Sequence, residues 1–287
     1  MYELALFDDT CISYIGIDTY QLSLNYDISI ESIKKLGEII KNKKISQLYL
    51  NYDINPESMK HLCNIIKDTN ISDLSLNYNL NLKSMKYLCN AIKYNKSIIF
   101  FQLCCNINLE SMEYLSEAIK ENKSIIFFQL CCNINLELMK YLSEAIKENK
   151  TIIILRISNN INAESIKYLD EVLKNHESVT HLILNYNVID NKLMKYLCKK
   201  LESNKKIKTL NLTGNRFSNL GLIYLNNLLK KNTIINKVYL HKNNYDDNGI
   251  KHLLKNLEYN KTITDIDIKC NNDIYRMYLD KIESNKI

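Results

Sequence analysis

The chain has 287 residues and carries 38 Lys and Arg against 32 Asp and Glu, a net charge of +6 that does not by itself indicate a nucleic-acid-binding protein. No segment has the ~18 apolar residues that a transmembrane helix needs, and the first residues lack the basic start of a signal peptide. We therefore expect an intracellular, cytoplasmic protein that binds no membrane, with its nine cysteines as reduced thiols.

Residues 1–18 precede any periodic pattern, and we expect them to cap one end of the structure. From residue 19 onward, an apolar residue recurs every 26 to 28 residues, with another apolar residue two positions before it. Alternation of this kind is typical of a short strand with one buried face. The ten recurring positions are Leu24, Leu50, Leu76, Leu103, Leu130, Ile157, Leu184, Leu212, Leu240 and Ile268.

Two consecutive repeats in the middle of the chain are almost identical. Residues 97–123 read SIIFFQLCCNINLESMEYLSEAIKENK, and residues 124–150 differ from them only by Leu138 in place of Ser111 and Lys140 in place of Glu113. A tandem copy at a fixed period of this size is the signature of a solenoid, whose repeats stack and contact only their neighbours.

Each strand is followed by a segment with helical periodicity. In the third repeat, Met85, Leu88 and Ile92 fall on one helical face. Each repeat is thus predicted to be a strand, a turn, a helix and a return loop. The last repeat, residues 272–287, is short and is expected to cap the other end. With one Pro, five Gly and no linker, residues 1–287 are predicted to form a single solenoid domain.

The eighth strand–helix repeat carries a family pattern. Residues 207–229 read IKTLNLTGNRFSNLGLIYLNNLL, or IxxLxLxxNxFxxxGxxxLxxxL, which resembles the leucine-rich repeat family and its longer, ribonuclease-inhibitor-like class. The resemblance covers residues 19–287, although the first six repeats are a residue or two shorter. Repeats this short must stack to bury their apolar faces. The predicted fold is an α/β, right-handed solenoid (horseshoe) of about ten strand–helix repeats, with a concave parallel sheet and convex helices.

An Asn, or an Asp in the first two repeats, follows each recurring position by three residues. A buried amide both donates and accepts hydrogen bonds, so it can satisfy loop backbone groups of two neighbouring repeats. We therefore expect a structural ladder, weaker at Asp27 and Asp53. Its Asn positions are Asn79, Asn106, Asn133, Asn160, Asn187, Asn215, Asn243 and Asn271. Asn95, Asn122 and Asn149 stand where helices should end, and Asn tolerates the left-handed cap conformation.

The strand residues that alternate with the buried ones should lie on the concave face. They are large and apolar in the middle repeats and polar in the outer repeats, which is the pattern of an interface. Phe100 and Phe127 should form a two-ring strip beside Ile154. The residues expected to contact a partner protein are Phe100, Gln102, Cys104, Phe127, Gln129, Cys131, Ile154, Arg156, Ile183, Tyr49 and Tyr239. Possible aromatic anchors just beyond this face are Tyr26, Tyr52, Tyr78 and Tyr186.

Two further groups of residues, the paired cysteines and the lysines at the helix ends, allow an alternative function. The pairs Cys104–Cys105 and Cys131–Cys132 could indicate a zinc site or a disulfide, but their spacing is CC rather than CxxC. One sulfur of each pair should also point away, so we expect no metal. The lysines that gather at one end of most helices should compensate the helix dipoles, with nucleic-acid or other anion binding as the alternative.

The sequence contains no catalytic motif: there is no phosphate-binding Gly loop, no HExxH and no nucleophile with a base at motif spacing. We therefore expect no catalytic residue, no cofactor and no enzymatic activity, and the sequence favours a protein-interaction module. The family resemblance leaves an alternative, a GTPase-activating protein of the nuclear-transport GTPase activator type, with Asn215 and Arg216 as loop candidates. The abundance of Asn, Lys and Ile is typical of an AT-rich genome.

Overall fold

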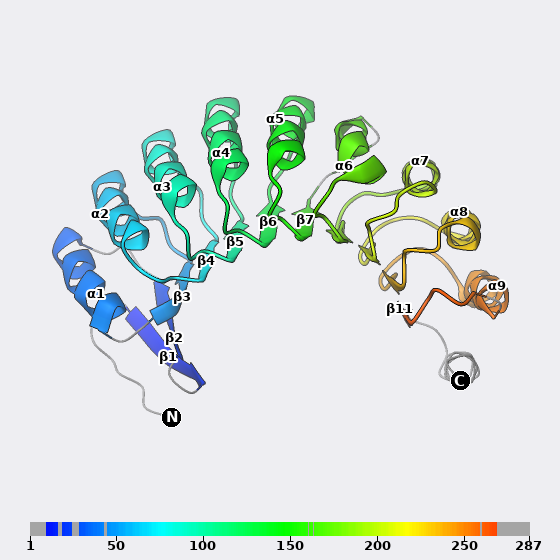
Figure 1. Cartoon of the computed structure of the whole chain (residues 1–287), viewed down its shortest axis with the longest axis horizontal. Coiled ribbons are helices and arrows are strands. Elements are labelled where there is room, and N and C mark those ends of the chain that lie inside the picture. The colour runs from blue at the N-terminus through cyan, green and yellow to red at the C-terminus, as the bar shows by residue number, and fades with distance from the viewer. Residues whose placement is uncertain are drawn as a thin grey trace. The chain divides into compact units, whose positions relative to one another are not determined.

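The computed structural model describes residues 10–16, 19–24, 29–42, 45–159, 161–162, 164–258 and 260–268. The chain packs as two compact units, the first unit (Met1–Ile152) and the second unit (Ile153–Ile287). Strands and helices alternate along each of them (Figure 1).

In the first unit, β1 pairs antiparallel with β2 and covers its outer edge, while β2 to β6 pair in chain order, each parallel to the next. A parallel pair needs a crossover connection, which is the helix of each repeat. In Figure 1, helices α1 to α5 all lie on one side of these strands. The elements are β1 (Thr10–Gly16), β2 (Thr19–Leu24), α1 (Ile30–Asn42), β3 (Ile45–Leu50), α2 (Pro56–Lys67), β4 (Asp73–Leu76), α3 (Leu82–Tyr94), β5 (Phe100–Leu103), α4 (Leu109–Glu121), β6 (Phe127–Cys131) and α5 (Leu136–Glu148).

In the second unit, β7 to β11 also pair in chain order and parallel. The elements are β7 (Ile154–Ser158), the 3₁₀ helix η1 (Ser165–Leu169), α6 (Asp170–Asn175), β8 (His181–Ile183), α7 (Asn191–Leu201), β9 (Thr209–Asn211), α8 (Asn219–Lys231), β10 (Lys237–Tyr239), α9 (Asp247–Leu257) and β11 (Asp265–Asp267). The predicted caps lie largely outside the described residues: β1 is the described part of residues 1–18, and none of residues 272–287 is described.

The predicted α/β solenoid of about ten repeats is confirmed. Ten strands, β2 to β11, alternate with helices in the described residues, and all of them run parallel to their neighbours within each unit. The recurring positions of the sequence, such as Leu50 and Leu103, are fully buried. The predicted helical face of the third repeat, Met85, Leu88 and Ile92, is also fully buried. Period-2 and period-3.6 patterns therefore meet in one core between the strands and the helices.

An inward-facing Asn lies at the C-terminal end of α3, α4, α5, α7, α8 and α9 and joins neighbouring repeats, whereas α2 ends at Asp68 and α6 at His176. The Asn122 side chain donates to the carbonyl oxygens of Ile92 and Asn95, at 2.8 and 3.1 Å, and accepts from the backbone N–H groups of Ser124 and Ile125, both at 2.8 Å. This single amide thus bonds four backbone groups, two at the end of the preceding helix and two in its own return loop. The same bonds recur in both units, at Asn95, Asn149, Asn204, Asn232 and Asn260.

The backbone of these cap residues differs from the sequence prediction. Asn122 has φ −65° and ψ 136°, which is extended rather than left-handed, and Asn95 and Asn149 are similar. The extended backbone turns the amide inward between two repeats. We name this column the helix-end ladder.

The Asn ladder that the sequence predicted at the ends of the strands does not extend through the first unit. Asn79, Asn106 and Asn133 are exposed there, and the residue before each of them, as in Cys105 and Cys132, is buried instead. One bond links this exposed column, from the Asn106 backbone N–H to Asn79 Oδ1 at 2.8 Å. The remaining positions Asn160, Asn271 and Asp27 lie outside the described residues.

In the second unit the predicted ladder is present. Asn187 and Asn215 are buried. The Asn215 side chain donates to the carbonyl oxygens of Leu184 and Leu212, at 2.9 and 2.8 Å, and accepts from Ile189 N–H at 3.1 Å. Asn243, which is half-buried, donates in the same way.

The two units differ because of the residue before this Asn. In the second unit it is left-handed in each described repeat: φ is +75° at Asn159, +53° at Tyr186, +70° at Gly214 and +55° at Lys242. No other described residue has positive φ. A left-handed residue reverses the chain direction, so the next side chain points inward. The described residues of the first unit keep negative φ at this position, and Tyr78, Cys105 and Cys132 are buried there, whereas Tyr52 is exposed.

The helix-end ladder generates a stability prediction. Asn122→Ala removes the acceptor of Ser124 N–H and Ile125 N–H, at about 1–3 kcal/mol for each group that stays unpaired, while the Ile92 and Asn95 carbonyl oxygens each lose one of two donors. Allowing for some rehydration, we expect the free energy of unfolding, measured by urea denaturation followed by circular dichroism, to fall by about 2–4 kcal/mol. Asn106→Ala, in the exposed column, is the matched control and should change stability by less than about 0.5 kcal/mol. Equal losses in the two variants would contradict the assignment of the buried column.

The open face of the sheet

Side chains on one side of the strands face away from the helices, and we call this side of each unit its open face. On β5, Phe101 and Leu103 are fully buried toward the helices, while Phe100 and Gln102 are half-buried on the open face. Because β5 and β6 pair in register, Phe100 lies opposite Phe127, and Gln102 opposite Gln129. Equivalent residues of neighbouring repeats therefore stand side by side.

The centre of the open face of the first unit is a pair of aromatic rings. The ring centroids of Phe100 and Phe127 lie 4.7 Å apart with an interplanar angle of 67°, an edge-to-face arrangement. Such pairs are favoured by the ring quadrupoles. Directly behind them, Phe101 and Phe128 stack at 5.9 Å in the core. The half-buried rings thus rest on a rigid layer, and one side of each remains available for contact.

Polar side chains beside the rings are bonded to one another across repeats. Gln102 donates to Asn77 Oδ1 at 2.8 Å, and Asn77 donates to Asn51 Oδ1 at 2.7 Å. Gln129 donates to Cys131 Sγ at 3.1 Å and is only 6% exposed. The predicted contact residue Gln129 is thus on the open face but offers little surface, whereas Gln102, Cys104 and Cys131 are half-buried.

The next two strands give this face a polar margin. Asp73 on β4 lies opposite Phe100, and Gln47 on β3 lies opposite Asp73. Tyr49 donates to Gln47 Oε1 at 3.4 Å, and burial together with the Asp73 charge raises the pKa of Tyr49. Tyr49 therefore stays a neutral hydrogen-bonding phenol at the edge of the apolar pair.

The open face of the second unit carries the remaining predicted residues. Ile154, Arg156 and Ile183 are half-buried on β7 and β8, which pair in register. Arg156 Nε donates to Asn185 Oδ1 at 3.0 Å, and Ser158 Oγ donates to the same oxygen at 3.0 Å. The guanidinium is thereby held flat along the sheet. Since Ile154 belongs to the second unit, its predicted place beside the two Phe rings stays a prediction.

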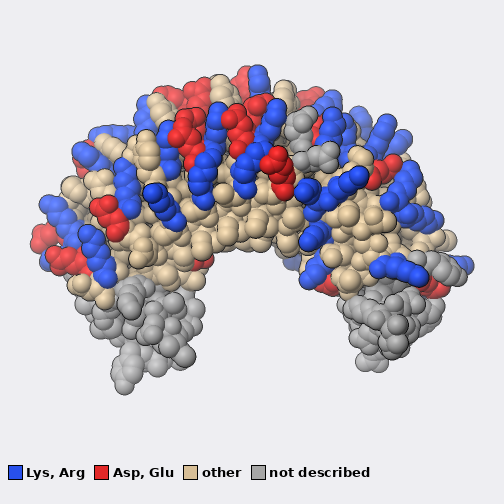
Figure 2. Space-filling model, viewed as in Figure 1, with Lys and Arg blue, Asp and Glu red and all other residues tan. Residues whose placement is uncertain are grey.

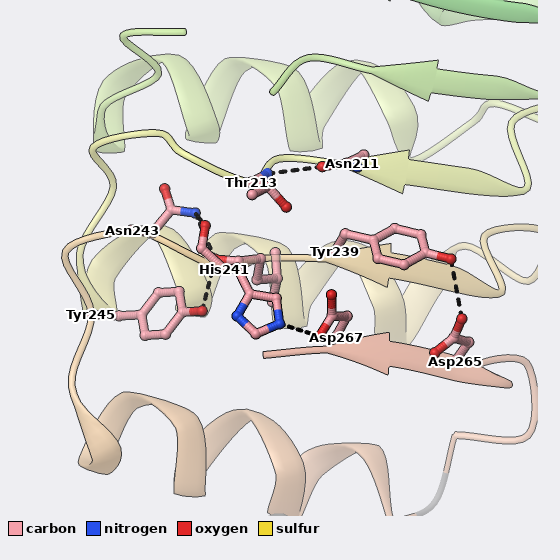
Figure 3. A network of polar contacts seen from close by, with 9 residues as sticks. Asn211, Thr213, Tyr239, His241, Asn243, Tyr245, Asp265 and Asp267 are labelled. Carbon is pink, nitrogen blue, oxygen red and sulfur yellow. Dashed lines mark hydrogen bonds and ion pairs between the residues drawn. The ribbon is translucent and has the colours of Figure 1, made fainter. Parts of the chain in front are cut away.

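Tyr239 on β10 and His241, two residues later, each contact an Asp of β11 on this face (Figure 3). Tyr239 donates to Asp265 Oδ2 at 3.1 Å, and His241 Nε2 contacts Asp267 Oδ1. Burial, followed by the charge of Asp265, raises the pKa of Tyr239. Tyr245 lies on the loop beyond and donates to the Leu240 carbonyl oxygen at 2.7 Å. The hydroxyl groups of Tyr239 and Tyr245 thus both donate within the chain.

The expected anchors beyond the face divide into two groups. Tyr52 and Tyr186 are nearly half exposed, whereas Tyr78 is buried, with its hydroxyl 3.7 Å from Met59 Sδ. Tyr78 is therefore a core residue and not an anchor. Tyr26 lies outside the described residues.

The lysines at the helix ends of the first unit pair with acids of the next repeat. Lys93 Nζ lies 3.4 Å from Glu117 and 3.0 Å from Glu121, and Lys120 Nζ lies 2.8 Å from Glu148. In Figure 2 basic and acidic side chains alternate over these helices. These pairs favour compensation of helix dipoles and acids over an anion-binding surface.

Each Cys pair places one thiol outward and one inward, as the sequence predicts. Cys104 and Cys131 are half-buried on the open face, and Cys105 and Cys132 are buried. Burial raises the pKa of Cys105 to about 12 and raises that of Cys132 as well. Among the described residues, no group of three His, Cys, Asp or Glu side chains could hold a metal ion. None of the helices in the described part of the chain is long and apolar enough to cross a bilayer.

Comparisons with known proteins give matches among solved structures alone. No protein-family model and no curated protein matches the chain. Among solved structures, actin-binding site 2 of leiomodin-1 aligns with a TM-score of 0.38 and 17% identity, over 59% of this chain and 86% of that chain. A protein from Bacteroides fragilis aligns with a TM-score of 0.47 and 10% identity, over 90% of both chains.

Cysteine labelling tests the orientation of the two Cys pairs. In the native protein at pH 8, we expect iodoacetamide to modify Cys104 and Cys131 first, because a buried thiol with a raised pKa holds almost no reactive thiolate. Cys63, Cys89, Cys105, Cys132 and Cys198 are buried and should react only after unfolding in urea. Peptide mass spectrometry over a time course measures each site. Labelling of Cys105 or Cys132 as fast as that of their neighbours would show that the turns are oriented differently.

Proposed function

We propose that the protein is a non-enzymatic, cytoplasmic protein-interaction module of the leucine-rich repeat family, in its ribonuclease-inhibitor-like class, and that it binds a partner protein on the open face of the first unit. The observation that carries the proposal is the half-buried, edge-to-face pair of Phe100 and Phe127. Large rings on a rigid sheet supply apolar area at little cost in conformational entropy.

The surroundings of the rings support this use. Asn51, Asn77 and Gln102 already bond to one another, so covering them leaves fewer polar groups unsatisfied. Asp73 and Tyr49 add polar groups at the margin. An apolar centre with a polar margin is how protein interfaces are built. The complementary partner surface would present apolar side chains to the rings and hydrogen-bond donors to Asp73.

The double variant Phe100→Asp, Phe127→Asp tests the proposal. Each buried ring typically contributes about 1.5–3 kcal/mol, so we expect partner affinity to fall by about 100-fold or more. The measurement is quantitative affinity capture from the native cell, followed by a direct binding titration with the captured protein. The fold should persist, because both rings lie outside the core.

The matched control is Tyr94→Asp, Tyr114→Asp, which places the same charges on exposed aromatic residues of α3 and α4. We expect this variant to retain partner binding. Loss of binding in the control with retention in the Phe variant would move the interface to the helices and refute the proposal.

A second expectation concerns the GTPase-activator alternative. Arg216 is exposed on the loop after β9, but Asn215 is buried and its amide bonds the backbone of two repeats. We expect the protein not to accelerate GTP hydrolysis by a panel of small GTPases, measured as phosphate release. An arginine finger typically gives ~10³-fold acceleration or more. Acceleration of that size that is lost in Arg216→Ala would replace our proposal with the alternative.

A further inference from the structure

The outer surface of α8 breaks a pattern that the other helices keep. The position five residues after the N-cap carries a charge in seven other α-helices: Lys34, Lys60, Lys86, Glu113, Lys140, Lys195 and Lys251. The position two residues after the N-cap is charged in six of them and is Asn248 in α9. In α8 these two positions are Ile223 and Leu220, which are 51% and 44% exposed. At these two positions α8 therefore presents large apolar side chains to solvent, where most of the other helices carry a charge.

A groove lies beside these residues, between α8 and α9. It has a volume of about 460 Å³ and is lined by three apolar side chains, Leu222, Ile223 and Leu253, and by the polar side chains of Asn219, Asn226, Asn248, His252 and Asn256. Gly249 lets α9 approach α8 closely, because an added Cβ would lie 2.2 Å from Asn219 Oδ1. Asn226 is buried, and its Oδ1 has no hydrogen-bond partner among the described residues. The groove thus combines an apolar strip with amide and imidazole side chains.

The charge around the groove is positive. The second unit holds 22 Lys and Arg against 14 Asp and Glu, a net charge of +8, whereas the first unit holds 16 against 18, a net charge of −2. Lys195 on α7 reaches toward α8, with its Nζ 5.8 Å from the centroid of the Tyr224 ring. Lys251 occupies the position equivalent to Ile223 on the other side, in α9, so lysines flank the apolar pair on both sides. Lysine predominates over the second unit in Figure 2.

The acids nearest to the groove offset these lysines only in part. Asp246 caps α9, accepting from Asn248 N–H and Gly249 N–H at 2.9 and 3.0 Å, and it also accepts from Asn219 Nδ2 at 2.8 Å. Its carboxylate is therefore satisfied within the chain. Asp247 stands four residues before Lys251 on the same face of α9 and offsets part of its charge, while Lys255 lies one turn further on, so the charge becomes more positive toward the C-terminal end of that helix.

We propose that the groove between α8 and α9 binds an acidic amphipathic helix of a partner protein, on a surface distinct from the open face. An amphipathic helix inserts apolar residues spaced i, i+3 or i+4, and i+7 into a groove of this kind. Leu220 and Ile223 receive that apolar stripe, and the carboxylates beside the stripe face Lys195 and Lys251. Charge complementarity requires a partner helix with a negative net charge and speeds its association. A basic helix would meet the same lysines and be repelled.

The experiment selects binders of the full-length protein from a displayed library of 20-residue peptides. Peptides that also bind the variant Leu220→Lys, Ile223→Lys are removed in each round. Lysine occupies both equivalent positions in α7, as Lys192 and Lys195, so this variant is compatible with the fold, and urea denaturation verifies its stability. The matched control is Leu109→Lys, Leu136→Lys, which changes two exposed leucines of the first unit by the same charge.

We expect the enriched peptides to be net negative with helical apolar periodicity. Their affinity, measured by fluorescence anisotropy, should fall by at least about 10-fold in Leu220→Lys, Ile223→Lys and in Lys195→Glu, Lys251→Glu, and should not change in the control. Several outcomes would overturn the proposal: no peptide that distinguishes the wild type from the groove variant, enriched peptides that are basic or lack the apolar stripe, or binding that is lost instead in Phe100→Asp, Phe127→Asp.

Discussion

The solenoid depends on satisfying the backbone groups where each helix ends and the chain turns back to the sheet. At these ends the last carbonyl groups have no partner within the helix, and the return loop adds N–H groups that face the core. The helix-end ladder meets both needs at once, since each Asn donates to the preceding repeat and accepts from its own loop, as Asn122 and Asn232 do. Packing of the helices and pairing of the strands then follow at a fixed spacing.

Variation in the turns at the other edge explains why the two units differ. A left-handed residue before the turn Asn, as at Tyr186 and Gly214, directs that Asn inward. Gly214 has a further reason to lack a side chain, because a Cβ there would lie 2.5 Å from the Tyr186 ring. The first unit uses shorter turns and fills the same space with apolar or thiol side chains such as Tyr78 and Cys105. Two solutions to one loop-closure problem therefore occur in one chain.

The sequence predicted the strand and helix of each repeat because their periods of 2 and 3.6 differ clearly. It also placed Phe100 and Phe127 correctly relative to the buried Phe101 and Phe128. It failed at the turns, where a polar column looks the same whether it points inward or outward: Asn106 is exposed and Asn215 buried, although they share a register position. The available signals were the extra residue of the 28-residue repeats and the recurrence of Asn95, Asn122 and Asn149 at a constant spacing. Contacts within the open face, such as Gln102 with Asn77, depend on rotamers and could not be predicted.

The near-identical repeats 97–123 and 124–150 make contacts that are copies of one another. Asn122 bonds to the carbonyl groups of residues 92 and 95, and Asn149 repeats these bonds with residues 119 and 122. The side of each copy that faces the next repeat thus fits the side that faces the previous repeat. A further duplication of the DNA segment would therefore create no contact between repeats that the chain does not already contain. Such a segment can change in copy number by unequal recombination while the fold is conserved, so the length of the open face is an evolutionary variable that is separate from its chemistry.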